Sequence, residues 1–312
     1  MRALEPRPGN DGILGDLHVA TWAATKRSLH LYAQMLGKIR VALSPTQPNW
    51  MFTPLYLSPR GLTTGTIPVG TASCEVMLDV FNSKIDVLHS EGLERSIALL
   101  PARSVAAVYA DLSAALEALH IACVVSTAPQ ELSDLTPLDS DERPSDYDPE
   151  HVRRWFKAAT AISAIFERWR SHFFGRSGIQ VWWGAFDVAL ILFNGKHVAP
   201  PTDRGYIMKY DLDAELMNVG LYLGDENTSP FFFGYIFPEP EGAEALPMRP
   251  ASASWSAQLH EWILPYDAVR SAPDPEAFLT TFLDAIYEQC FISAGWNREA
   301  LTYDAPTHRR TR

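Results

Sequence analysis

Apolar residues recur at helical spacing along four long segments, and this pattern predicts amphipathic helices that pack against a core. The segments are residues 19–43, 103–119, 148–173 and 274–295. The third segment is the most regular, because its apolar side chains from Val152 to Phe173 form one wide stripe. Asp148 and Asp274, each followed by Pro and Glu, predict the N-terminal caps of the last two helices.

Shorter segments between these helices alternate in polarity or are continuously apolar, which predicts β-strands. They are residues 52–58, 74–81, 84–89 and 95–100, then 179–193, 214–224, 231–237 and 261–265. The second segment alternates most clearly, with Cys74 and Val76 on one face and Glu75 and Asp79 on the other. We therefore expect antiparallel sheets that bury one face.

The chain reads twice in the order helix, several strands, helix. Short echoes in the same order support a weak internal duplication. They include GKIRVAL at 37–43 with GRSGIQV at 175–181, and ALLPARSV at 98–105 with WILPYDAV at 262–269. The predicted fold class is therefore α+β, with two pseudo-repeated halves that each pack long amphipathic helices on a mainly antiparallel sheet.

Proline and acidic residues mark the boundary between the halves. The first half covers about 15–128 and the second about 148–300, and the stretch 129–147 is an acidic, proline-rich surface linker. We expect residues 1–14 and 301–312 to form disordered tails.

Composition narrows the class of protein. The chain has 312 residues, 47% of them hydrophobic, and a formal net charge of −11 with a pI near 5.3. Such a charge repels phosphate backbones, so we expect no nucleic-acid partner. No apolar run reaches the length of a membrane span, and three scattered cysteines suggest free thiols. These features predict a cytoplasmic protein, while the oligomeric state stays open.

Known catalytic and cofactor motifs do not occur in the sequence. There is no G-x-S-x-G elbow, Walker loop, H-E-x-x-H helix or G-x-G-x-x-G fingerprint. The nine histidines show no ligand spacing. The sequence therefore signals no metal and no cofactor.

Asp187 is the most unusual residue of the predicted strands. It stands within 179–193, whose faces are both mostly apolar, as in a central strand. A buried, unpaired carboxylate is costly, so Asp187 needs a partner or a raised pKa. Two interpretations remain open. Asp187 makes a structural hydrogen bond or ion pair, or it lies at the floor of a pocket.

Glu215 repeats this pattern on the strand 214–224, where it shares a face with Met217 and Val219. Two carboxylates on apolar faces are candidates for an acid/base pair. Such a pair requires Asp187 and Glu215 to face one cleft within roughly 5–10 Å of each other. The position of Glu215 at the start of its strand, near solvent, equally favours a structural role.

Aromatic residues concentrate in the stretches VWWG and FFFGYIF of the second half. Such a cluster either belongs to the core or lines an apolar cavity with a few polar groups. In the second case we expect Trp183, Phe233 and Tyr235 to line the pocket, with Asp187 as its polar anchor.

Two cations beside glycines complete the candidate ligand-binding residues. Arg60 lies in SPRGLTTG and Lys38 follows Gly37. Glycine lets the anionic group of a ligand approach backbone amides. Solvated turns explain both cations equally well.

Three segments of the chain resemble a known family. They are HLYAQMLGKIRVALSPTQPNWMFTPLYLSPRGLTTGTIP, WWGAFDVAL and LPYDAVRSAPDPEAFLTTFLDAIYE. They are similar to an uncharacterised bacterial family of about 300-residue proteins, catalogued as a domain of unknown function, over nearly the whole chain. The resemblance implies one unit over residues 15–300 and no activity. It also implies that family members often have His at position 180 and His-Glu at 214–215, where this chain has Gln180 and Ala214-Glu215.

Three functions follow from these features. The first is a cytosolic protein that binds a small apolar or amphipathic ligand in an aromatic-lined pocket. The second is a hydrolase- or lyase-like enzyme that uses Asp187 and Glu215 as acid and base. The third is a structural or protein-interaction module, which has no pocket and exposes an apolar patch instead.

Overall fold

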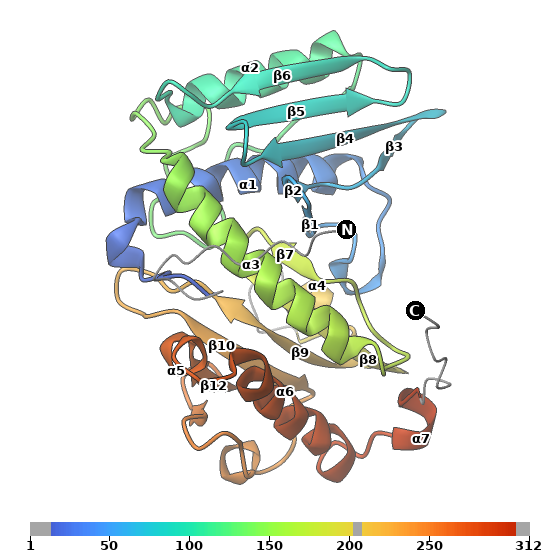
Figure 1. The fold of residues 1–312 in the computed structure, drawn as a ribbon. Coiled ribbons are helices and arrows are strands. Elements are labelled where there is room, and N and C mark those ends of the chain that lie inside the picture. The colour runs from blue at the N-terminus through green and yellow to red at the C-terminus, as the bar shows by residue number, and fades with distance from the viewer. Residues whose placement is uncertain (1–13, 202–207, 304–312) are drawn as a thin grey trace, which may run out of the picture.

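Two antiparallel sheets of six strands each form the framework of the protein (Figure 1). The computed structural model describes residues 14–201 and 208–303. The strands of the first sheet are β1 (Tyr56–Ser58), β2 (Gly61–Thr63), β3 (Ile67–Val69), β4 (Ala72–Asp79), β5 (Lys84–His89) and β6 (Glu94–Ala98). Those of the second are β7 (Gln180–Trp182), β8 (Asp187–His197), β9 (Ala214–Tyr222), β10 (Phe231–Phe237), β11 (Ser254–Ser256) and β12 (Glu261–Pro265).

Four long helices cover one face of each sheet, as the apolar periodicity predicts. They are α1 (Ala23–Leu43), α2 (Val105–Ala118), α3 (Pro149–Arg170) and α6 (Pro275–Ile292). Shorter helices are η1 (Val19–Thr21), η2 (Pro48–Trp50), α4 (Met208–Asp211), η3 (Ala243–Ala245), α5 (Tyr266–Arg270) and α7 (Arg298–Leu301). The predicted caps are confirmed, because the carboxylates of Asp148 and Asp274 accept hydrogen bonds from the amides of Glu150 and Ala277.

The helices α1 and α3 pass between the two sheets and pack on each other (Figure 1). The helix α2 packs on β5 and β6, and α6 packs on β9 and β10. The apolar side chains of both halves meet in one continuous core. Burial of these apolar faces is the main force that holds the halves together. None of the helices in the described part of the chain is both long and apolar enough to cross a membrane.

The α+β architecture is confirmed, and the order of elements matches an internal duplication. In each half a long helix is followed by the strands and then by a closing helix. The strand order is β1-β2-β4-β5-β6, with β3 also paired to β4, in one sheet and β11-β12-β10-β9-β8-β7 in the other. The edge strands β1 and β7 meet where Leu55 and Val181 exchange two backbone hydrogen bonds of 2.9 and 2.8 Å.

The two sequence echoes have different outcomes. Residues 98–105 and 262–269 occupy equivalent places, since each joins the last core strand of its half to the next helix. Residues 37–43 lie inside α1, whereas 175–181 follow α3. The pair 98–105 and 262–269 fits a duplication, whereas the pair 37–43 and 175–181 does not.

The expectation of one continuous strand over 179–193 is wrong. The chain turns at residues 183–186 and forms a hairpin, in which Trp182 pairs with Asp187 and Gln180 with Ala189. The amide of Phe186 closes the turn by donating to the carbonyl of Trp182 at 2.7 Å. This reversal puts Asp187 on the same face as Gln180 and Trp182, and it removes Trp183 from that face.

The stretch 129–147 is irregular, as predicted, but it is not a loose surface linker. Gln34 of α1 exchanges two hydrogen bonds, 2.7 and 2.9 Å long, with the backbone of Gln130. Arg27 binds the buried carboxylate of Asp141 at 2.5 Å. These contacts attach the stretch along α1.

Most of the two predicted tails lies outside the described residues. At the N-terminal boundary, Leu14 is buried in the core. At the other end, the amide of Phe174 donates to Leu301, and the amide of Tyr303 donates to His172. Residues 301–303 therefore belong to the folded unit.

A glycine on α1 sets how closely the turn 183–186 approaches the first half. A Cβ atom at Gly37 would lie 2.1 to 2.2 Å from three atoms of the Trp183 ring. The indole cannot move away easily, because its Nε1 donates to the carbonyl of Thr53 at 2.9 Å. Only glycine fits at this contact.

We therefore expect Gly37→Ala to destabilise the protein despite the higher helix propensity of alanine. Overpacking costs about 1–3 kcal/mol, and we expect the upper end for this rigid contact, which exceeds the roughly 1 kcal/mol gained from propensity. Urea unfolding measures the difference. The control is Gly178→Ala, where a Cβ atom meets nothing within 4 Å. Equal stability of the two variants would contradict this packing.

Candidate functional site

The second sheet has one face in the core and one face with a different composition. Val188, Leu190 and Val219 point into the core toward α3 and α6. We call the opposite side the Asp187 face. The strand register places on it Gln180, Trp182, Asp187, Asn218, Tyr222, Phe231, Phe233, Tyr235 and Glu261. These side chains combine aromatic rings with carboxyl and amide groups.

The hairpin turn before β8 fixes the position of Asp187. Phe186 has a φ of 62°, in the left-handed region that bulky residues rarely adopt. Its ring is stacked between His30 and Trp155, with ring centroids 4.9 and 5.2 Å apart. Packing by neighbouring side chains therefore imposes this backbone conformation. Such strained residues occur most often at functional sites.

His30 of α1 joins the turn to the first half. Its Nε2 lies 2.9 Å from the carbonyl oxygens of both Trp183 and Gly184, so it donates to this pair of acceptors. Burial lowers the pKa of His30 to about 4, which keeps the ring neutral at physiological pH. The site on the second sheet is thus held by a helix of the first half.

Asp187 itself is buried without a cation. Its side chain is 7% exposed, and none of the side chains in the described part of the chain forms a hydrogen bond or ion pair with its carboxyl group. Burial raises the pKa of Asp187 to about 8, and the charges of Glu131 and Glu261 add to the shift. Asp187 is therefore mostly protonated at neutral pH.

Four other buried polar atoms at this site lack hydrogen-bond partners. They are Gln180 Oε1, Trp182 Nε1 and Asn218 Oδ1 on the face itself, and Asp211 Oδ1 beside it. An unsatisfied buried group costs about 1–3 kcal/mol, so native proteins rarely keep several together. The structure has eleven such atoms among its described residues, and these four are the ones that lie on or beside the Asp187 face.

Further acids surround this face. Burial raises the pKa of Glu261 to about 7. It also raises that of Asp211 to about 7, together with the charges of Glu131 and Asp213. The pKa of Tyr235 is raised by burial and by the charge of Asp211. Neither Glu261 nor Asp211 forms an ion pair within the described residues.

Small residues let the aromatic rings lie close to the sheet. Ala189, Gly220 and Phe233 are neighbours across β8, β9 and β10. A Cβ atom at Gly220 would lie 2.6 Å from Cζ of Phe233, so this ring covers the glycine. Phe231, Phe233 and Ala189 form a small apolar cluster, separate from the main core, that Trp182 and Tyr235 border.

The structure separates the predicted ligand-binding residues. Phe233 and Tyr235 lie on the Asp187 face. Trp183 lies in the core against α1, and Lys38 donates to the carbonyl of Ala128 at 2.6 Å. The Nζ atom of Lys38 is also 5.4 Å from the Trp183 ring, and burial lowers its pKa to about 8.

Arg60 and Glu215 also lie away from Asp187. Arg60 is on the first sheet and binds Asp79. Glu215 binds Asn194 and lies 3.6 Å from Nζ of Lys196. Because Val188 pairs with Leu221, Asp187 lies beside Tyr222, seven residues from Glu215 along β9.

The positions of Asp187 and Glu215 do not match those expected for an acid/base pair. An odd number of residues puts Glu215 and Tyr222 on opposite faces of the sheet, and the distance along the strand is roughly 23 Å at about 3.3 Å per residue. Asp187 and Glu215 therefore do not face one cleft. The positions for which the resemblance implies histidine are also distant, because Gln180 aligns with Gly220 through Ala189, six residues from Ala214 on the same face of β9.

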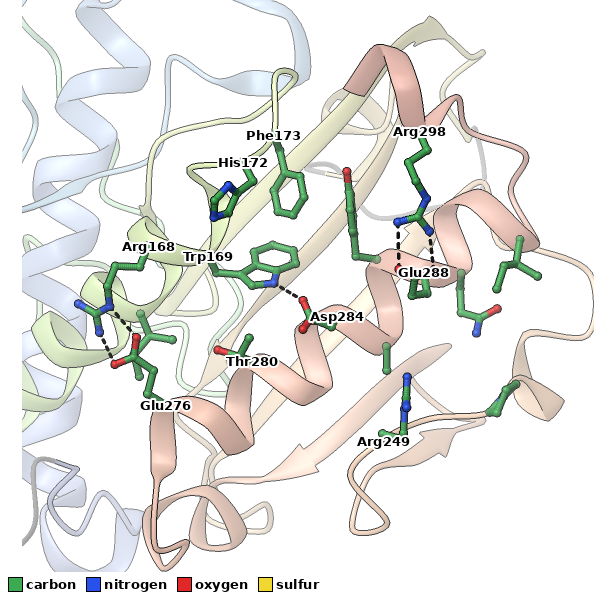
Figure 2. Close-up of a pocket in the computed structure, with 16 residues that line it drawn as sticks. Arg168, Trp169, His172, Phe173, Arg249, Glu276, Thr280, Asp284, Glu288 and Arg298 are labelled. Carbon is green, nitrogen blue, oxygen red and sulfur yellow. Dashed lines mark hydrogen bonds and ion pairs between the residues drawn. The ribbon is translucent and has the colours of Figure 1, made fainter. Parts of the chain in front are cut away.

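A groove of about 1110 Å³ opens elsewhere, between the end of α3, α6 and α7 (Figure 2). Four of its charged side chains form two ion pairs within the protein. Arg168 makes two bonds of 2.6 Å to Glu276, and Arg298 binds Glu288 through two nitrogens. The groove contains none of the residues that sequence analysis proposed. These two ion pairs neutralise part of its charge, whereas Arg249, which also lines the groove, forms no ion pair with a described residue.

The comparison with protein families matches residues 14–303, nearly the whole chain, to a family of unknown function, DUF5996. The chain belongs to the DUF5996 family. No curated protein and no solved structure matches it. The resemblance noted in the sequence is thereby confirmed, and the DUF5996 unit covers both sheets and the stretch that joins them.

Sequence reasoning missed several residues of the Asp187 face. Asn218, Glu261 and Asp211 were not proposed, and Trp182 rather than Trp183 shares the face with Asp187. The available signal was Gly184, since glycine inside a strand often marks a turn or bulge. A turn predicted at this glycine would place Trp182, instead of Trp183, on the same face as Asp187.

The buried carboxyl group predicts a pH dependence of folding. Folded Asp187 keeps its proton up to a pH of about 8, whereas an aspartate in an unfolded chain loses it near pH 3.9. Between these values the folded state binds more protons, so the free energy of unfolding falls as pH rises, by up to about 1.4 kcal/mol per pH unit.

Asp187→Asn should remove this contribution and stabilise the protein at pH 7 relative to wild type. Urea unfolding between pH 5 and pH 8 measures the effect. Asp139→Asn, the same change at an exposed position, is the control. A pH dependence identical to wild type in Asp187→Asn would contradict the assignment.

Proposed function

We propose that this protein binds a small amphipathic molecule on the Asp187 face. The supporting observation is the group of unpaired, buried polar atoms around Asp187, set among aromatic rings. Binding sites for small molecules commonly combine apolar walls with a few oriented polar groups. A ligand that pairs with these atoms removes the cost of leaving them unsatisfied.

The first sheet provides an internal comparison. Its face away from the core also carries acids, but each of three has a partner. The carboxylate of Glu75 accepts from Thr63, Asp79 binds Arg60, and Asp86 lies 2.8 Å from Lys84. The architecture shared by the halves therefore does not require unpaired acids, and their presence in the second half supports a separate role.

The positions of the acids favour binding over acid/base catalysis. Asp187 and Glu215 lie on opposite faces, so the pair expected for a hydrolase or lyase is not formed. The remaining acids near Asp187 stand among aromatic rings, and none of the described Lys or Arg side chains forms an ion pair with Asp187, Glu261 or Asp211. Binding needs only complementarity, which these groups offer.

Native mass spectrometry of the protein purified from its own host tests the proposal. We expect a fraction of the wild-type chain to carry an additional small-molecule mass, and we expect Asp187→Asn to lose it. Asp139→Asn should retain it. A wild-type sample with only the mass of the bare chain, together with no stabilisation by a metabolite library, would refute binding.

Two buried glutamines separate a functional role from a structural one. Gln180 is 2% exposed with its Oε1 unpaired, whereas Gln34 is 0% exposed and bonds the backbone of Gln130 through both polar atoms. A buried polar group that pairs only with a ligand lowers the free energy of unfolding of the ligand-free protein, whereas one that pairs within the protein raises it.

We therefore expect opposite signs for the same substitution. Gln180→Met should leave the free energy of unfolding unchanged or raise it by about 1 kcal/mol, because it removes an unsatisfied atom. Gln34→Met should lower it by about 1–3 kcal/mol, because it leaves the Gln130 backbone unpaired. Thermal and urea unfolding measure both. Loss of stability in both variants would show that Gln180 is structural.

A further inference from the structure

The groups on the Asp187 face indicate the chemical class of the ligand, and this inference rests on the proposed binding function. Of the four unpaired buried atoms, three are oxygens that accept hydrogen bonds: Gln180 Oε1, Asn218 Oδ1 and Asp211 Oδ1. Gln180 and Asn218 are 2% and 9% exposed, so water satisfies them poorly. A ligand that pairs with these atoms must donate hydrogen bonds.

The charge of the site points in the same direction. Asp187, Glu261 and Asp211 lie close enough for Asp187 and Tyr235 to sense neighbouring acids, and Glu131 stands at the rim beside Gly184. Within residues 14–201 and 208–303, neither Lys nor Arg pairs with the first three of these acids. Among the described residues these acids therefore have no counter-ion, and a bound cation favours their ionised form.

The aromatic rings distinguish an organic cation from a metal ion. Trp182, Tyr222, Phe233 and Tyr235 border the same face as Asp187, and cations with an apolar body bind over such rings. The described residues contain no group of three or more His, Cys, Asp or Glu side chains that could hold a metal ion. The surface between the acids is apolar, as an alkyl or aryl group requires.

We propose that the ligand of the Asp187 face is a small organic amine, bound as the ammonium ion. The ammonium group donates hydrogen bonds to Asp187 and to the oxygen of Gln180, which lies close to Asp187 on the same face of the β7–β8 hairpin. Its apolar part lies on the rings of Phe233 and Tyr235. When the ammonium ion binds, Asp187 transfers its proton to solvent, so charge balances as one cation enters and one proton leaves.

Isothermal titration calorimetry with matched compounds tests this class. The probes are primary and quaternary alkylamines and arylalkylamines, each with the alcohol and the carboxylate of the same skeleton. We expect at least one amine to bind about tenfold or more tighter than its alcohol, as charge and cation–π contacts together provide, and the carboxylate not to bind. Titrations in buffers of different ionisation enthalpy should show proton release at pH 7.

Two variants assign the preference to the site. Asp187→Asn should reduce the preference for amine over alcohol at least about tenfold, since one ionic contact is lost. Asp139→Asn should leave it unchanged. The acids and phenols that face Asp187 are Glu131, Glu261, Tyr222 and Tyr235. If Asp187→Asn still releases a proton on binding, the proton comes from one of these groups, and the proposed exchange at Asp187 is contradicted.

The outcomes separate this inference from the proposed function. If an alcohol or a carboxylate binds as tightly as its amine, or native mass spectrometry finds a neutral or anionic ligand, the amine class is wrong and the binding function stands. If no probe binds and the purified protein carries no ligand, both are wrong.

Discussion

The burial of Asp187, with no cation paired to it among the described residues, is the constraint on which the site depends. A carboxyl group at this position is tolerated only because it stays protonated, and its place is fixed by the turn before it. That turn holds Phe186 at a φ of 62° between the rings of His30 and Trp155. Three elements distant in sequence therefore cooperate to keep one acid in an apolar environment.

The outer faces of the two sheets differ in how their acids are paired. Each half builds an antiparallel sheet whose apolar face meets the common core. On the outer face of the first sheet, acids such as Asp79 and Asp86 form ion pairs. On the second, Asp187 and Glu261 stand among aromatic rings, and neither forms an ion pair with another described residue. Natural proteins often accept lower stability at functional sites, and this contrast fits that rule.

Much of the fold, but less of the site, could be predicted from the sequence. The helices, their caps and the alternation around Cys74 depend on local spacing, so the sequence predicts them, with helix ends within four residues of those observed. The site depends on a hairpin at Gly184 and on the register of six strands, which are long-range properties. The apolar run 179–193 resembles one central strand, and this placed Trp183 and not Trp182 beside Asp187. Alternation alone cannot reveal a turn in which Phe186 adopts a left-handed conformation.

A crystal structure of the protein isolated from its own host tests the central claim most directly. The account predicts electron density for a small molecule on the Asp187 face, within hydrogen-bonding distance of Asp187 and of the amide oxygen of Gln180. A face without such a molecule, in which these two side chains bond each other or a cation of the protein, would contradict it.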